Sequence, residues 1–111
     1  MGLANATIAD AEELRRLTNM QCPVFILYVS NDCPACTTAA PLFESIAAKY
    51  PSVLSMVVDC AQTQRNEEVT GTPTGLLYLN GERKEKMPGF GPLDNQAQFV
   101  EDIFKRYTLP T

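Results

Sequence analysis

Cys33 and Cys36 are separated by two residues and lie between an apolar segment and a helical pattern. Residues 24–29 are apolar without interruption, which is typical of a strand covered on both faces. Residues 37–50 are expected to form a helix. A cysteine at the start of a helix lies where the helix dipole favours a thiolate. A CxxC pair at such a junction has the placement that thiol–disulfide exchange requires.

Length and charge limit the remaining possibilities. We expect residues 1–111 to form one domain, because this length supports a single apolar core. The net charge of −4 argues against nucleic acid or an anionic membrane as a partner. The chain contains no histidine, which excludes histidine catalysis and His-ligated metals.

Hydropathy predicts a protein that does not span a membrane. Apolar runs fall far short of the ~20 residues that a spanning helix needs. The first seven residues lack the basic and long hydrophobic regions of a signal peptide. We therefore expect a soluble, cytoplasmic protein.

Four cysteines leave more than one interpretation open. Cys22 and Cys60 are isolated, and Cys33 and Cys36 are too close to join distant elements. One redox-active pair in a reducing compartment fits this spacing better than a disulfide framework. The alternatives are an inert pair, or a structural zinc site that includes Cys22 and Cys60. Otherwise these two are expected to be small buried apolar residues, with a regulatory or dimer-forming role as the alternative.

Helical and strand patterns alternate along the rest of the chain. One further expected helix begins at Thr7 and ends near Leu17. A closing helix is expected after Asp94, which acts as its cap. Residues 62–70 are expected to form a short helix or a helical loop. The further expected strands are 53–58, 74–79 and a polar edge strand at 82–87, after the turn Asn80-Gly81. This order predicts an α/β domain with parallel crossovers followed by an antiparallel hairpin.

Two expected helices have apolar faces that should point into the core. In the helix at 37–50, the inward residues are expected to be Leu42, Phe43, Ile46, Ala47 and Tyr50. In the closing helix, they are expected to be Ala97, Val100, Ile103, Phe104 and Tyr107.

Several motifs in this order resemble those of the thioredoxin family. They are Cys33-Pro34-Ala35-Cys36, Pro41, Asp59, Gly71-Thr72-Pro73-Thr74, Leu79-Asn80-Gly81-Glu82 and Gly89. The resemblance covers nearly the whole chain. It implies a thioredoxin fold, with a central mixed sheet of four to five strands flanked by about four helices. It also implies that the Thr72–Pro73 bond is cis.

The resemblance implies a thiol–disulfide oxidoreductase that needs no cofactor or metal. Cys33, expected to be exposed with a lowered pKa, would attack, and Cys36, more buried, would resolve the mixed disulfide. The implied substrate-binding residues are Asp32, Thr72, Pro73 and Gly89. The implied partners are disulfide-bearing client proteins and an electron donor of the thioredoxin-reductase type. The protein is expected to be a monomer.

The chain also departs from the family pattern. Asp32 stands where the family usually has tryptophan. Leu27 replaces a buried carboxylate that assists proton transfer at the second thiol, and Ser55 falls where the lysine partner of that acid is expected. These departures support an alternative: a thioredoxin-fold binding module or assembly subunit whose redox pair is not used for turnover.

Overall fold

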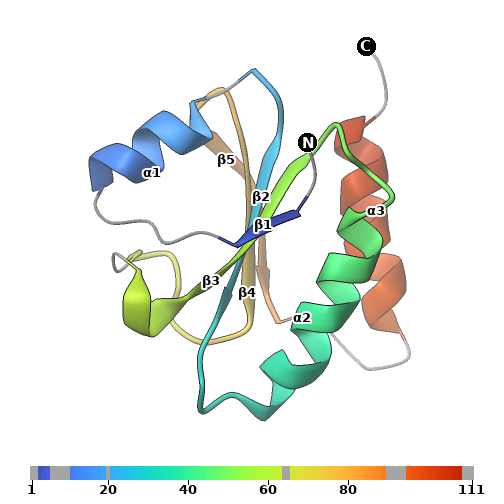
Figure 1. Ribbon diagram of the computed structural model, residues 1–111. Coiled ribbons are helices and arrows are strands. Elements are labelled where there is room, and N and C mark those ends of the chain that lie inside the picture. The colour runs from blue at the N-terminus through green and yellow to red at the C-terminus, as the bar shows by residue number, and fades with distance from the viewer. Residues whose placement is uncertain (1–2, 6–10, 20, 64–65, 90–94, 109–111) are drawn as a thin grey trace.

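The computed structural model describes residues 3–5, 11–19, 21–63, 66–89 and 95–108 (Figure 1). The sheet has five strands in the order β1-β3-β2-β4-β5. The strands are β1 Leu3–Asn5, β2 Val24–Val29, β3 Leu54–Asp59, β4 Thr74–Leu79 and β5 Glu82–Pro88. The helices in this part of the chain are α1 Ala11–Thr18, α2 Pro34–Ala47, α3 Gln96–Thr108 and the short 3-10 helix η1 Cys60–Gln62.

The pairing of the strands makes the sheet mixed. β1 and β2 both run parallel to β3, while β4 runs antiparallel to β2 and to β5. Val29 pairs with Asp59, so the carboxyl ends of β2 and β3 meet at one edge of the sheet. This is the thioredoxin fold expected from the sequence, with β2 in the centre and β5 at an edge.

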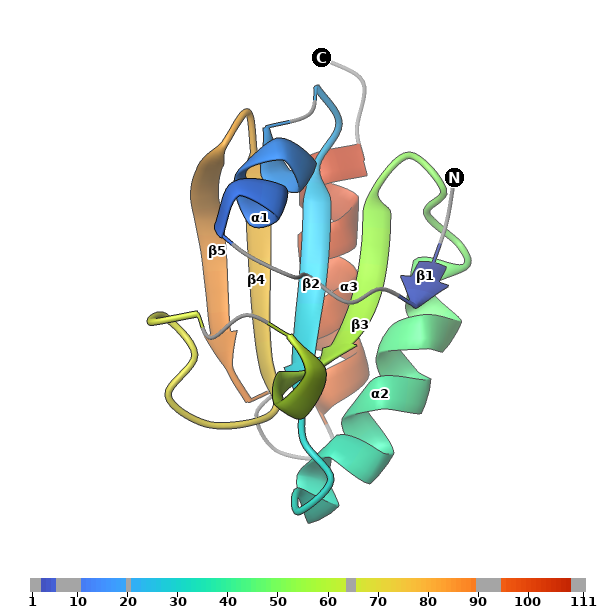
Figure 2. The same cartoon turned by 60° about the vertical axis from the view of Figure 1, so that its left-hand side comes forward.

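Helices cover both faces of the sheet. α1 lies on one face, and α2 and α3 lie on the other, as both views show (Figures 1 and 2). β2 sends Phe25 and Leu27 into the core under α2 and α3, and Val24, Ile26 and Tyr28 into the core on the α1 face. This two-sided burial explains why the strand is apolar throughout.

Aromatic rings form the centre of the core under α2 and α3. The Phe25 ring packs edge-on against Phe43, with centroids 5.0 Å apart, and lies 5.1 Å from the Phe104 ring. Tyr50 stacks on Phe104 at a centroid distance of 5.5 Å. These contacts join β2, α2 and α3. A fully buried phenylalanine stabilises a fold by about 1.5–3 kcal/mol.

Helix α2 begins three residues earlier than expected and ends three residues earlier. It begins at Pro34 because a proline at the first helical position loses no intrahelical hydrogen bond. It ends at Ala47, residues 48–49 form a turn and Tyr50 follows that turn, so the expectation of Tyr50 within the helix is wrong. The Tyr50 ring nevertheless reaches the core. Strand β3 is displaced by one residue from the expected range.

Other expectations differ from the structure near the ends of elements. Ala97 is exposed, so its expected inward position is wrong, whereas Val100, Ile103 and Phe104 are buried. Exposing a single methyl group costs little, which makes such a position hard to assign. Tyr107 is half-buried against the same core. Asp94 lies outside the described residues.

The segments around α1 and after β3 were only partly anticipated. Thr7 lies outside the described residues, and α1 ends at Thr18, one residue after the expected end. After η1, the described residues up to Thr70 form turns rather than an α-helix. The Asn66 side chain accepts a hydrogen bond from the Glu68 amide at 2.9 Å, and such local bonds compete with helix formation. No helix in the described ranges is long and apolar enough to cross a membrane.

Candidate active site

Cys33 and Cys36 form a disulfide at the beginning of α2, with Cα atoms 5.2 Å apart. Cys33 is the N-cap residue of the helix, and its Sγ accepts a hydrogen bond from the Cys36 amide at 3.1 Å. Pro34 occupies the first turn, where its missing N–H is tolerated. The first sulfur therefore lies at the positive end of the helix dipole, which stabilises negative charge on sulfur after reduction.

Both sulfur-bearing side chains are buried in the disulfide form. Cys33 is 8% exposed and Cys36 is 5% exposed. The expectation of an exposed Cys33 is therefore wrong for this state, because its sulfur is turned toward the helix amide and bonded to Cys36. Pro34 and Ala35, between the cysteines, are exposed. Asp32, immediately before Cys33, is exposed as well.

The loop before β4 is the second part of the site. The Thr72–Pro73 bond is cis, as the resemblance implied. The Pro73 carbonyl accepts a hydrogen bond from the Gly89 amide at 2.8 Å. Gly89 has a φ of 91°, a conformation that side-chain-bearing residues rarely adopt. The loop before β4 and the end of β5 are thus joined through the backbone.

An open pocket of about 190 Å³ lies along this loop. It is lined by residues 70–74 together with Pro88 and Gly89. Three of the four expected substrate-binding residues, Thr72, Pro73 and Gly89, therefore come together. Asp32 is not among the lining residues.

The Thr72 side chain reaches the segment that leads to the cysteines. Its Oγ1 lies 2.8 Å from Ser30 Oγ, at hydrogen-bond distance. Thr74 Oγ1 donates to the Gly71 carbonyl at 2.6 Å and closes the turn of the same loop. Sequence reasoning missed Ser30, because nothing in the local pattern links it to a residue 42 positions away.

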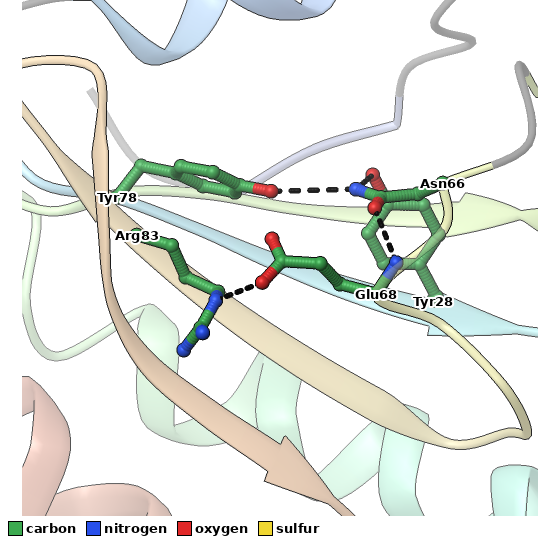
Figure 3. Close-up of polar contacts among 5 residues, drawn as sticks. All are labelled: Tyr28, Asn66, Glu68, Tyr78 and Arg83. Carbon is green, nitrogen blue, oxygen red and sulfur yellow. Dashed lines mark hydrogen bonds and ion pairs between the residues drawn. The ribbon is translucent and has the colours of Figure 1, made fainter.

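Figure 3 shows a polar network at the other end of this loop. Asn66 Nδ2 donates to the hydroxyl oxygens of Tyr28 and Tyr78, at 3.2 and 3.3 Å. Glu68 forms an ion pair with Arg83 of β5. Burial raises the pKa of Tyr28 from 10.0 to about 12, against the opposing effect of the Asn66 hydrogen bond. The network fastens residues 66–68 to the sheet.

No carboxylate stands at position 27. Leu27 is 0% exposed and packs in the apolar core under α2 and α3. Ser55, at the expected lysine position, is buried, and its hydroxyl lies 3.4 Å from the Val53 carbonyl oxygen. Asp59 uses its carboxylate to accept a hydrogen bond from the Ala61 amide at 2.9 Å, which caps η1.

The two remaining cysteines lie far from each other. Cys22 precedes β2 and Cys60 follows β3, so the parallel six-residue strands place them at opposite ends of the sheet, about 20 Å apart. A zinc site containing all four cysteines is therefore excluded. Both thiols are free and half-buried against the core on the α1 face. Burial, followed by the nearby Asp59 carboxylate, raises the pKa of Cys60.

A family model for thioredoxin matches residues 6–102. The fold and the bonded CxxC pair define a thioredoxin-like domain, and the chain belongs to the thioredoxin family. Among curated relatives, thioredoxin H5 of Oryza sativa subsp. japonica is 33% identical over 72 residues, covering 62% of this chain and 53% of that protein. A thioredoxin of Staphylococcus saprophyticus is 33% identical over 73 residues, covering 62% of this chain and 70% of that protein.

Solved structures show the same fold. The thioredoxin of Malassezia sympodialis superposes with a TM-score of 0.78 at 16% identity, covering 98% of this chain and 94% of that one. The thioredoxin of Schistosoma mansoni gives a TM-score of 0.73 at 24% identity, with coverages of 96% and 95%. Family membership and the Cys33–Cys36 disulfide support thiol–disulfide exchange chemistry in general.

Proposed function

We propose that this protein is a protein-disulfide reductase that acts through the Cys33/Cys36 pair. The observation that carries the proposal is the disulfide at the N-terminus of α2, in which the Cys33 sulfur accepts a hydrogen bond from the Cys36 amide. When oxidised, a disulfide at this position can accept electrons. When reduced, one of its two thiols is the nucleophile and the other resolves the mixed disulfide.

The reaction begins with the reduced protein. The Cys33 thiolate attacks one sulfur of a client disulfide, which forms a mixed disulfide and releases the first client thiolate. Cys36 then loses its proton and attacks the Cys33 sulfur. This step forms the Cys33–Cys36 disulfide and releases the second client thiolate. Two electrons pass to the client, and a reductase of the thioredoxin-reductase type restores the dithiol.

The client is proposed to bind along the loop before β4. The open pocket lined by Thr72, Pro73 and Gly89 supports this proposal, because an extended client segment could lie along it. Asp32 is proposed to contact the client from the segment before Cys33, where it is exposed. We propose that the reaction takes place in the cytoplasm, where thiols are kept reduced. We also propose that the protein acts as a one-domain monomer.

One observation favours a second function, a thioredoxin-fold binding module or assembly subunit. Leu27 fills an apolar position with no carboxylate to accept the Cys36 proton. A redox pair with slow resolution can persist without catalysing turnover.

Reduction of insulin distinguishes the two functions. A reductase should reduce insulin in the presence of a thiol donor, and Cys33→Ser should abolish this activity. Cys22→Ser is the matched control because Cys22 lies at the opposite end of the sheet from the pair. A wild-type protein that fails to accelerate insulin reduction would contradict the reductase and favour the binding module.

A further inference from the structure

A side-chain hydrogen bond connects the two segments that form the site. Ser30 is the first residue after β2, and its Oγ lies 2.8 Å from Thr72 Oγ1. Ser30 lies three residues before Cys33, and Thr72 comes immediately before Pro73. Both residues are half-buried. The bond therefore joins the segment carrying the attacking sulfur to the loop that lines the pocket.

Other contacts already hold the rest of this loop. Asn66 fastens one end to Tyr28 and Tyr78 (Figure 3), and the Gly89 amide holds the Pro73 carbonyl at the other end. Thr72 lies between these anchors. Its link to the cysteine-bearing segment runs through the Ser30 hydroxyl, which makes this contact sensitive to a single substitution.

We propose that Ser30 is a positioning residue for client binding, which acts through Thr72. This inference rests on the proposed reductase function. In the native arrangement the Thr72 hydroxyl is engaged by Ser30, so the threonine side chain is fixed and its backbone is presented to the client in one orientation. Threonine has few side-chain rotamers, so one hydrogen bond is enough to select among them.

Loss of the Ser30 hydroxyl removes this selection. The Thr72 hydroxyl must then find water or another hydrogen-bond partner, and the loop must be ordered when the client binds. Ordering on binding weakens affinity without changing the bonds made or broken in the reaction. The effect should therefore fall on the KM for a protein client, whereas kcat and the reactivity of Cys33 should remain unchanged.

The test compares Ser30→Ala and Ser30→Thr with the wild type in two assays. With insulin, Ser30→Ala should raise KM about threefold to tenfold, the effect of losing one hydrogen bond, and leave kcat unchanged. With the small disulfide dithiobis(nitrobenzoate), which cannot extend along the loop, the rates should be equal. Ser30→Thr retains the hydroxyl and should restore the insulin KM.

A double-mutant cycle with Thr72→Val separates this role from a general structural one. If the two hydroxyls act together, Ser30→Ala should have no further effect on KM in the Thr72→Val protein. Independent additive effects, an unchanged insulin KM in Ser30→Ala, or an equal loss with the small disulfide would overturn the role of Ser30. If the wild type itself does not reduce insulin, the proposed function fails, and the role of Ser30 in client binding fails with it.

Discussion

The Cys36 amide nitrogen lies 3.1 Å from Cys33 Sγ, so one sulfur of the disulfide also caps helix α2. The two cysteines therefore differ in environment although both are buried. Cys33 lies at the helix end, where negative charge is stabilised, and Cys36 lies one turn inside the helix. This asymmetry predicts different roles for the two thiols.

We expect Cys36→Ser to accumulate mixed disulfides with client proteins through Cys33. The first attack survives in this variant, whereas the resolving thiol is absent. Cys33→Ser should trap no client and lose all reductase activity. Non-reducing gel electrophoresis after incubation with an oxidised client measures both outcomes, with Cys22→Ser as a control that should behave as the wild type. Equal trapping by Cys33→Ser would contradict this division of roles, because the roles would then be reversed or the pair would not be catalytic.

Leu27→Asp should lower the free energy of unfolding by about 3–5 kcal/mol at neutral pH, because it buries an unpaired carboxylate in an apolar core. Leu27→Asn has the same shape without the charge and is the matched control. The difference between the two variants should shrink in acid, where the aspartate is protonated. Urea denaturation at several pH values measures it. Equal stabilities at neutral pH would mean that the aspartate carries no unpaired charge in the folded protein, because it is protonated there or has found a cation.

The same position predicts how fast the mixed disulfide is resolved. Without a carboxylate at position 27, release of client from a Cys33 mixed disulfide should be slow at neutral pH and accelerate toward alkaline pH, as the Cys36 thiol loses its proton. Single-turnover release as a function of pH measures this rate. Fast release that does not change with pH would show that another group accepts the proton.

Local patterns in the sequence predicted the parts of the fold that depend on nearby residues. The two-sided burial of β2, the Asn80-Gly81 turn and the CxxC pair at the start of α2 are of this kind, and the structure contains all three. Strand β1 has only three residues and depends on pairing with β3, so no local pattern marks it. The Ser30–Thr72 and Asn66 contacts likewise arise only when distant segments meet.

Phe104→Ala and Phe99→Ala should differ sharply although both lie on α3. Phe104 is 0% exposed and contacts the rings of Phe25, Phe43 and Tyr50, whereas Phe99 is 47% exposed. Removing a buried phenylalanine costs about 3–5 kcal/mol, and removing the exposed one should change stability by less than about 0.5 kcal/mol. Urea denaturation compares the two. Similar losses would place α3 differently against the sheet.

Tyr28→Phe should reduce the sensitivity of the fold to alkaline pH. Burial raises the pKa of Tyr28 to about 12 in the folded protein, above the unfolded value of 10.0. The raised pKa contributes stability that is complete below pH 10 and is lost as pH rises toward 12, because the unfolded chain loses the proton first. Relative to its own stability at pH 7, Tyr28→Phe should retain about 1–3 kcal/mol that the wild type loses over this range. Urea denaturation between pH 7 and strongly alkaline pH measures the difference, and phenolate absorbance follows the titration.

Tyr78→Phe, which removes the other hydroxyl bound by Asn66, should retain stability in the same direction, since burial raises the pKa of Tyr78 as well. Equal alkaline losses in the wild type and Tyr28→Phe would mean that the Tyr28 hydroxyl is open to solvent.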